Sequence, residues 1–354
     1  MAEGGVICAG TIVTDYVVIV DQWPIENSLS NIHRQAKTGG GGPFNIVKDL
    51  RAMDENLPLS IVGLLGNDEN GQWLINDCKK SNIDTDQLHI TDDQTPTSYT
   101  YVISVESTGR RTFFNQRGTN ALLSDRHFDF EYLAKKKHHR LFYLGYLTIL
   151  DGLDQIVDNG TIAAQVLRKA KAFDLETVVD FVSAPNPWYS QIAQYTLPYV
   201  DHLILNEIEL GYILKQSFQE GTIAEIEEGG RVLLEKYGVQ QTVTIHFDRG
   251  AVCVSRTKNS NIESYFQGSF SLPNGYIKGA VGAGDAFAAG IIYGIYRKWS
   301  MEERLRCGIC VATMCLADET PYAGVRTIEE CMKLMDTFKF RSLERTSFAN
   351  DTEN

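Results

Sequence analysis

The chain of 354 residues lacks any apolar stretch long enough to span a lipid bilayer. Its first five residues also lack the basic region and the apolar core that define a secretory signal peptide. These two absences argue against a membrane-spanning or secreted protein. We therefore predict a cytoplasmic protein that has no membrane partner.

The sequence also has no excess of basic residues. The sequence contains 33 Lys and Arg against 45 Asp and Glu, which gives a formal net charge of -12 at pH 7. A general nucleic-acid binder needs a basic surface to contact phosphates. The composition therefore excludes nucleic acid as a general partner, and any anionic ligand must be held by a local site.

A disulfide framework is not indicated either. The seven cysteines are an odd number and are scattered along the chain. Cys307 and Cys310 have CxxC spacing, but no second pair and no nearby histidine completes four metal ligands. The apolar residues around them indicate a buried helix, so we interpret the cysteines as reduced core residues.

What the sequence does contain is an alternation of short apolar, β-branched runs and longer helical stretches. This alternation is typical of parallel strands joined by right-handed crossovers, with helices on both faces of the sheet. Ligands of such folds bind beyond the carboxyl ends of the strands. The expected strands lie at residues 6–9, 59–63, 141–144, 177–180, 202–205 and 242–245.

Two segments interrupt the alternation, at residues 12–37 and 97–118. Both are predicted to form β-hairpins, and the turn of the second contains Gly109. With 43% hydrophobic residues, the chain can bury a large core. We expect one domain over residues 1–340, which includes these strands, followed by a polar, mobile tail over residues 341–354.

The most informative motif is Gly282-Ala283-Gly284-Asp285, which directly precedes an apolar run at residues 286–292. Small residues let backbone N–H groups converge on an anion, and the following helix adds the positive end of its dipole. A carboxylate beside such an anion site would act as a base. The alternative is an ordinary turn with an N-cap aspartate.

A second glycine cluster, at residues 39–42, lies far upstream and also opens a helix. Pro43 suits the first helical position, where its missing N–H is not needed. Phe44, Val47 and Leu50 then mark a buried face. The glycines would allow a ligand to approach the backbone closely.

These clusters and two further motifs, in this order, resemble the ribokinase-like (PfkB) carbohydrate kinases over most of the chain. The resemblance implies an α/β fold, a ribokinase-like three-layer sandwich with a central mostly parallel sheet and a small β-sheet lid formed by residues 12–37 and 97–118. It also implies site residues for each ligand. Those for the sugar are Asp15, Gly40, Gly41 and Asn45; those for Mg²⁺, bound through water, and for the phosphate region are Asn206 and Glu209.

The resemblance implies that Asp285 is the catalytic base, which accepts the proton of a sugar hydroxyl as the hydroxyl attacks the γ-phosphorus of ATP. Gly282, Ala283 and Gly284 would stabilise the negative charge on the transferred phosphoryl group. The lid would close over the sugar and exclude water. Lid strands could also pair between two subunits, so a homodimer is possible.

Three segments depart from the family pattern, and in one of them, residues 180–182, the asparagine of the family's Asp-x-Asn motif is missing. Residues 279–281 read Gly-Ala-Val where relatives have Asp-Thr-Thr or a close variant, so the aspartate used with a monovalent cation is missing and no such cation is assigned. The family's Gly-x-x-Gly loop is replaced by the longer segment of residues 246–250. Within this segment, Asp248 and Gly250 are expected to contact the nucleotide.

The expected acceptor is a neutral hexose or pentose, because Gly118-Thr119-Asn120 and the Gly-Pro-x-Asn form of the first glycine motif look like those of sugar kinases. Arg110, Arg111 and Arg117, in or beside the lid, could instead meet a carboxylate or phosphate on the acceptor. Two other functions stay open. They are a nucleoside kinase and a non-catalytic sugar-binding regulator on the same fold.

Overall fold

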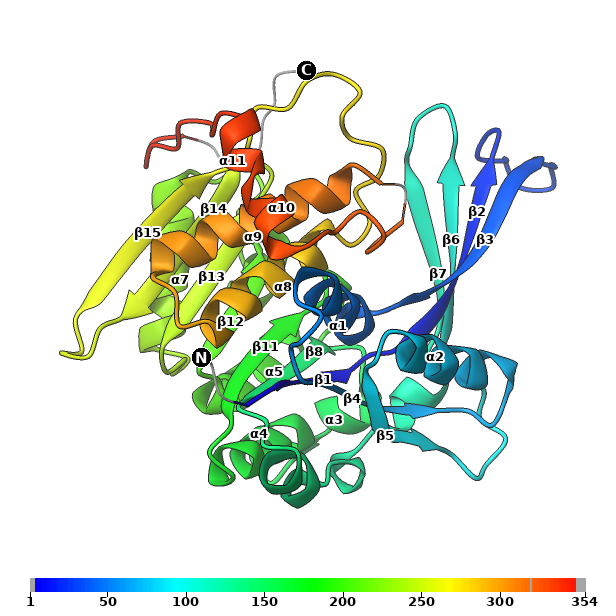
Figure 1. Cartoon of the computed structure of the whole chain (residues 1–354), viewed down its shortest axis with the longest axis horizontal. Coiled ribbons are helices and arrows are strands. Elements are labelled where there is room, and N and C mark those ends of the chain that lie inside the picture. The colour runs from blue at the N-terminus through cyan, green and yellow to red at the C-terminus, as the bar shows by residue number, and fades with distance from the viewer. Residues whose placement is uncertain (1–3, 319, 348–354) are drawn as a thin grey trace.

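A nine-stranded sheet forms the centre of the molecule in the computed structural model, which describes residues 4–318 and 320–347 (Figure 1). The strand order is β15-β14-β13-β12-β11-β8-β1-β4-β5. The strands from β13 to β5 pair in parallel, and β14 and β15 add antiparallel pairs at one edge. The bounds are β1 Val6–Gly10, β4 Leu59–Leu65, β5 Asp84–Ile90, β8 Leu141–Leu147, β11 Glu176–Phe181, β12 His202–Asn206, β13 Thr242–Phe247, β14 Gly250–Arg256 and β15 Ile262–Gly268.

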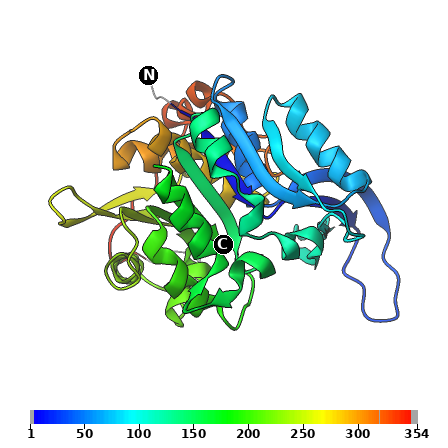
Figure 2. The ribbon, with the colours of Figure 1, turned by 90° about the horizontal axis from the view of Figure 1, so that it is seen from below.

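Helices cover both faces of this sheet, because successive strand residues point to opposite faces. Val6 and Cys8 of β1 pack into one hydrophobic core, whereas Ile7 and Ala9 pack into the other. The first core is covered by α1, α2, α8, α9 and α10, and the second by α3 to α7 (Figure 1, Figure 2). The α-helices are α1 Gly42–Met53, α2 Glu69–Lys80, α3 Asp151–Asp154, α4 Ile162–Ala172, α5 Tyr189–Thr196, α6 Glu207–Leu214, α7 Ile223–Glu235, α8 Ala283–Tyr296, α9 Met301–Leu316, α10 Ile328–Met332 and α11 Leu334–Thr337.

Shorter elements complete the chain. Three 3-10 turns, a π-helical segment and a two-stranded hairpin lie in the connections between the longer elements. They are η1 Gly118–Leu122, η2 Asp125–His127, η3 Glu131–Lys136, η4 Leu197–Tyr199, β9 Ile156–Val157 and β10 Gly160–Thr161.

A separate four-stranded sheet, the lid, stands beside the main sheet in the order β3-β2-β6-β7 (Figure 1). It consists of β2 (Val13–Val20), β3 (Ile32–Gly40), β6 (Tyr99–Val105) and β7 (Arg111–Gln116). The hairpins β2-β3 and β6-β7 are antiparallel, and β2 pairs with β6 in parallel. The two segments predicted to interrupt the α/β alternation therefore form the small sheet.

The predicted alternation is confirmed, since each of the six expected strands lies within an observed strand of the central sheet. Of the three strands that were not predicted, β5 and β15 are the two edges of the sheet, and β14 lies between β15 and β13. Strand β5 (Asp84–Ile90) carries polar residues at most positions because it has a neighbour on one side alone. An edge strand of this kind lacks the continuous apolar run that identifies the central strands.

The segment after residue 340 packs against the domain as far as it is described. The amide of Arg341 donates to the carbonyl of Ser269 at 2.7 Å, and the amide of Ile223 donates to the carbonyl of Ser347 at 2.8 Å. The guanidinium of Arg345 lies 2.7 Å from the carboxylate of Glu227 in α7. The rest of the predicted tail, residues 348–354, lies outside the described residues.

Candidate active site

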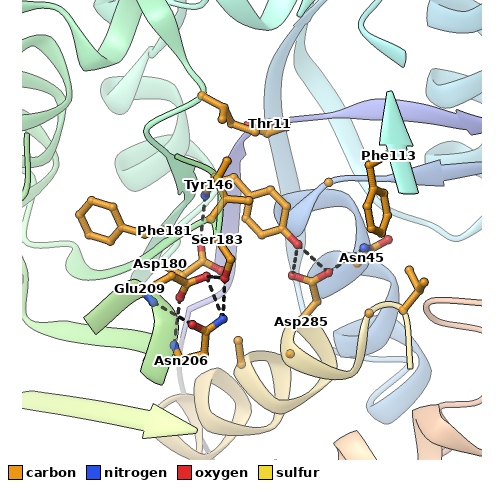
Figure 3. A pocket seen from close by; sticks show the side chains of 18 of the residues that line it. Thr11, Asn45, Phe113, Tyr146, Asp180, Phe181, Ser183, Asn206, Glu209 and Asp285 are labelled. Atoms are coloured by element: carbon orange, nitrogen blue, oxygen red, sulfur yellow. Dashed lines mark hydrogen bonds between the residues drawn. The ribbon is translucent and has the colours of Figure 1, made fainter. Parts of the chain in front are cut away.

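A cavity of about 890 Å³ lies where the carboxyl ends of the central strands meet the lid and the start of α8 (Figure 3). Five neighbouring strands each contribute to its wall. Thr11 follows β1, Tyr146 lies in β8, Asp180 in β11, Asn206 at the end of β12 and His246 in β13. The sheet thus presents polar side chains to one cavity at the end where open α/β sheets bind ligands.

Asp285 faces this cavity from the first turn of α8 and is buried. Asn45 Nδ2 donates a hydrogen bond of 2.8 Å to Asp285 Oδ2, and Tyr146 Oη lies 2.9 Å from Oδ1 and 3.1 Å from Oδ2. Burial raises the pKa of Asp285, while the hydrogen bonds from Asn45 and Tyr146 lower it. The side chain is therefore a buried carboxylate whose charged form is stabilised by two donors, as a general base requires.

Gly282 precedes α8 as its N-cap, with a left-handed φ of 79°. A Cβ at this position would overlap the carbonyl oxygen of Pro321, so the turn requires glycine. Gly282 and Gly284 line the cavity beside Asp285. The first N–H groups of a helix lack intrahelical partners and carry the positive end of the dipole, which suits this turn to an anion.

Ala283 takes a different place from its neighbours in the same motif. It is not among the described residues that line the cavity, and its amide donates to the carbonyl of Ala280 at 3.4 Å. Within the predicted phosphate turn, the structure therefore brings Gly282 and Gly284 to the cavity but directs the amide of Ala283 to the preceding loop.

The buried carboxylate of Asp180 holds Tyr146 in position. The amide of Tyr146 donates to Asp180 Oδ1 at 2.8 Å, and Tyr143 Oη donates to Asp180 Oδ2 at 2.6 Å. Tyr146 has a φ of 63°, which is uncommon for a residue other than glycine. The contact with Asp180 thus holds a turn of backbone from which the Tyr146 ring extends toward Asp285 (Figure 3).

The lid, α1 and the turn between them contribute the residues that were predicted to bind the sugar. Asp15 of β2, Gly41 and Asn45 line the cavity together with Asp285. Gly40 is not among the described lining residues, but a Cβ on Gly40 would overlap the carboxylate of Asp15. Burial raises the pKa of Asp15 to about 7, with a smaller contribution from the charge of Asp285. Gly40 thus makes room for a carboxylate that binds protons readily near neutral pH.

Two buried oxygens on this side of the cavity have no hydrogen-bond partner within the described part of the chain. They are Asn45 Oδ1 and Thr11 Oγ1, and both residues line the cavity. A buried polar atom without a partner costs free energy, so these atoms favour a polar ligand that would satisfy them.

Asn206 and Glu209 form a capping box at the start of α6. Asn206 Oδ1 accepts from the amides of Ile208 and Glu209 at 2.9 Å, and Glu209 Oε2 accepts from the Asn206 amide at 2.9 Å. Glu209 Oε1 also accepts from Ser183 Oγ at 2.9 Å. Burial is the main reason that the pKa of Glu209 rises to about 7, and the charges of Glu207 and Asp285 add to it.

The residues of this capping box also line the cavity, together with Ser183. In Figure 3 they form a second polar cluster beside the one around Asp285. No group of three His, Cys, Asp or Glu side chains among the described residues could hold a metal ion directly. The buried carboxylate of Glu209 fits an ion such as Mg²⁺ that keeps most of its water ligands, whereas Asn206 Oδ1 already accepts two backbone amides.

Asp248 and Gly250, the two residues expected to contact a nucleotide, are not among the described residues that line this cavity. Asp248 is exposed in the turn between β13 and β14, and Gly250 is the first residue of β14. His246, two residues earlier, lines the cavity instead. Burial lowers its pKa to about 4, so His246 is neutral at pH 7. The role of Asp248 and Gly250 stays a prediction.

Several lining residues were not assigned from the sequence. Thr11, Asp180, Ser183 and His246 lie at or just beyond the end of a strand whose position was predicted, so a search for polar residues at strand ends would have found them. Those on the lid share a face with Asp15, which the period of two along each strand indicates. The unassigned polar or aromatic lining residues include Thr11, Tyr146, Asp180, Ser183, His246, Thr100, Phe113 and Asn115.

The other candidate features fall outside the site. Cys307 and Cys310 are buried in α9, as predicted for core cysteines. Within residues 4–318 and 320–347, no helix combines the length and the apolar character needed to cross a membrane.

Comparison with known proteins gives one family and one fold. The model of the pfkB family carbohydrate kinases matches residues 4–328. Ribokinase from Cryptococcus neoformans in complex with ADP is similar, with a TM-score of 0.75 and 18% identity over 94% of this chain and 100% of that chain. Arabidopsis thaliana ribokinase with ribose and ATP has a TM-score of 0.73 and 20% identity over 95% and 99%. Fructokinase with bound ATP from Xylella fastidiosa has a TM-score of 0.71 and 17% identity over 94% and 98%.

Proposed function

The chain belongs to the pfkB family of carbohydrate kinases, and we propose that it transfers the γ-phosphoryl group of Mg-ATP to a hydroxyl of a small sugar, with Asp285 as the general base. The observation that carries this proposal is the buried Asp285 carboxylate, which faces the cavity beside Gly282 and Gly284. A base next to an anion site meets two needs of phosphoryl transfer. The base accepts the hydroxyl proton, and the anion site stabilises the charge on the phosphoryl group.

The sugar would lie between the lid and α1. Asp15, Gly41 and Asn45 line this part of the cavity, and the free Asn45 Oδ1 can accept a hydrogen bond from a sugar hydroxyl. Asn45 also donates to Asp285 at 2.8 Å. One side chain would therefore hold both the acceptor and the base, which fixes their relative positions before reaction.

The transferred phosphoryl group would lie at the start of α8. The cavity-lining turn at Gly282 and Gly284 supports an anion there, and the bound ADP and ATP of two similar ribokinases support a nucleotide as donor. Asn206 and Glu209 would hold Mg²⁺ through water. When bound, Mg²⁺ neutralises the developing charge on the phosphate oxygens. Glu209 would contribute the negative charge that attracts the ion.

The lid would close over the sugar. Phe113 of β7 lines the cavity yet is 57% exposed, which fits a side chain that becomes covered when ligands bind. Closure would exclude water and so favour transfer to the sugar over hydrolysis of ATP. The lid edges β3 and β7 also support pairing with a second copy in a homodimer. A cytoplasmic location fits this proposal.

The test measures ADP release from Mg-ATP with a panel of pentoses, hexoses, sugar acids, sugar phosphates and nucleosides. Wild-type protein and Asp285→Asn are compared, because asparagine keeps the shape and removes the base. We expect one sugar to be turned over and kcat to fall on the order of 10²- to 10⁴-fold in Asp285→Asn. Calorimetry should show that the variant still binds the sugar.

Three results would contradict parts of this proposal. Equal activity of Asp285→Asn and wild type would exclude Asp285 as the base. Turnover of a nucleoside alone would favour the nucleoside kinase. Sugar binding without any ADP release would favour the non-catalytic regulator.

A further inference from the structure

The inner face of the lid presents a cation that has no counter-ion. Arg111, the first residue of β7, lines the cavity and is half-buried. Among the described residues its guanidinium has no hydrogen-bond or ion-pair partner, in contrast to the other arginine of the cavity wall. That residue, Arg117, lies 2.7 Å from the carboxylate of Asp151. Arg111 and Arg117 are the two Arg or Lys side chains among the described lining residues.

From this arrangement we propose that the acceptor is a sugar with an anionic group, a phosphomonoester or a carboxylate, and that Arg111 binds this group. The inference rests on the proposed kinase function and names its substrate class. It replaces the neutral sugar expected from the sequence. Of the three arginines that the sequence placed in or beside the lid, the structure singles out Arg111.

Arg110 and Arg117 are less suited to this role. Arg110 is exposed in the turn between β6 and β7 and is not among the described residues that line the cavity. Arg117 is already neutralised by Asp151. Glu106, an acidic residue next to the same turn, is paired with His33 at 2.8 Å and leaves the charge of Arg111 uncompensated.

The register of the lid strands places Arg111 on the same face of the lid as Asp15, the residue proposed to bind the sugar. Thr100 pairs with both Asp15 and Asn115, and four residues farther along β6 Ser104 pairs with Arg111. Residues an even number apart on a strand share a face. Four residues of extended strand span about 13 Å, so the pair Ser104 and Arg111 lies beyond a monosaccharide ring held at Asp15. The guanidinium is therefore placed for a substituent that extends from the ring toward the tip of the lid.

An oxyanion suits this position for a physical reason. Burial lowers the pKa of Arg111, which means that its charged form is partly removed from water without compensation. A phosphate or carboxylate can accept two parallel hydrogen bonds from a guanidinium, and such charge-assisted pairs are stronger than bonds to a neutral hydroxyl. A neutral sugar would leave the charge unpaired when the lid closes.

The ATP phosphates are the competing partner for Arg111. The anion turn of the proposed donor site lies at Gly282 and Gly284 on α8, whereas Arg111 belongs to the lid face that carries Asp15 and Asn115. This placement favours the acceptor. A contact with ATP would affect every acceptor equally, which makes the two partners experimentally distinct.

The test compares a ketohexose, its 6-phosphate and a six-carbon aldonic acid as acceptors for wild type, Arg111→Gln and Arg110→Gln. We expect kcat/KM to be higher for one of the two anionic acceptors than for the neutral sugar. In Arg111→Gln, the ratio of kcat/KM for the anionic over the neutral acceptor should fall on the order of 10- to 100-fold. The neighbouring substitution Arg110→Gln should leave this ratio unchanged. The sugar phosphate and the aldonic acid distinguish the two sources of the anion.

Binding to Asp285→Asn, measured by calorimetry, separates this inference from the proposed catalysis. Tighter binding of an anionic sugar, lost on adding Arg111→Gln, would support the inference even if no acceptor is turned over. Preference for the neutral sugar, or an equal effect of Arg111→Gln on all acceptors with a raised KM for ATP, would overturn it.

Discussion

The hydroxyl of Tyr146 lies within hydrogen-bond distance of both carboxylate oxygens of Asp285, at 2.9 and 3.1 Å. The two residues come from β8 and α8, 139 positions apart in the sequence. Because the phenol donates to the charged form of the carboxylate, it opposes the effect of burial on the pKa of Asp285. Tyr146 is thus a positioning residue that lowers the pKa of the proposed base against the effect of burial.

Removal of this hydroxyl should change the pH dependence of the reaction. A base acts when deprotonated, so kcat/KM falls as the pH drops through the pKa of Asp285. In Tyr146→Phe that pKa rises further, and we expect the acid limb of the kcat/KM profile to move to higher pH. Tyr189→Phe, which removes a buried tyrosine hydroxyl outside the cavity lining, is the control. Superimposable profiles of wild type and Tyr146→Phe would show that the hydroxyl does not tune the base.

The close approach of Gly40 to Asp15 gives a second prediction. In Gly40→Ala the added methyl group overlaps the Asp15 carboxylate and must displace it. We expect the acceptor KM to rise at least about tenfold, the loss of one hydrogen bond to a charged group, with the KM of ATP nearly unchanged. In Gly160→Ala the nearest atom to the methyl group lies 3.6 Å away, so this variant should behave as wild type. An unchanged acceptor KM in a folded Gly40→Ala protein would argue against a sugar-binding role for Asp15.

The proposed role of Glu209 in Mg²⁺ binding can be separated from its structural role by comparison with Glu225. Both glutamates complete a capping box, at the starts of α6 and α7, but Glu225 is exposed and is not among the described residues that line the cavity. Glutamine at either position weakens the bond to the N-cap amide, and in Glu209→Gln the bond from Ser183 is affected as well. We expect Glu209→Gln alone to raise the Mg²⁺ concentration for half-maximal activity, by about tenfold for a loss of roughly 1.4 kcal/mol.

The pKa of Glu209 adds a pH dependence to this prediction. Its pKa is raised to about 7, so the side chain loses its charge as the pH falls through 7. The Mg²⁺ requirement of wild type should therefore increase toward acidic pH, and that of Glu209→Gln should change less. Magnesium titrations at pH 6 and pH 8 measure both effects. If Glu209→Gln and Glu225→Gln changed the Mg²⁺ requirement equally, Glu209 would have a role in the helix cap alone.

Lid closure should be visible in hydrogen exchange. Strand β7 (Arg111–Gln116) is an edge of the lid and contributes Phe113 to the cavity wall. We expect slower exchange of the β7 amides when acceptor and a non-hydrolysable nucleotide are bound together. Strand β15, an edge of the central sheet, serves as the control and should not change. Unaltered exchange in β7 would mean that the lid is already closed or does not close.

The sequence predicts the central strands because they are buried on both faces and form continuous apolar runs. For the same reason, the sequence does not identify Tyr146 as a site residue. It lies in Leu-Phe-Tyr-Leu-Gly-Tyr-Leu, the sequence of β8, where an aromatic residue is indistinguishable from the core residue Tyr143. The φ of 63° that turns Tyr146 toward Asp285 depends on Asp180, 34 residues later. No local pattern contains that information.

Two other positions show why spacing alone locates a site only approximately. Asn206 and Glu209 have the spacing of a capping box, and the structure shows this role as well as their place in the cavity wall. At the end of β13, the alternation of side chains puts His246 toward the cavity, whereas Asp248 is exposed in the following turn. Which residue of this segment lines the cavity therefore depends on where the strand ends, and the nucleotide contacts expected of Asp248 and Gly250 stay a prediction.

The hydrogen bond between Asn45 and Asp285 joins residues 240 positions apart, and α1 packs against α8 at the same place. During synthesis on the ribosome, α1 emerges long before the helix that will cover it. The part of its apolar face that α8 covers, in the core that includes Phe44, Val47 and Leu50, stays exposed while most of the chain is translated. Nascent chains that stall before residue 283 therefore expose apolar surface of α1 that the complete chain buries.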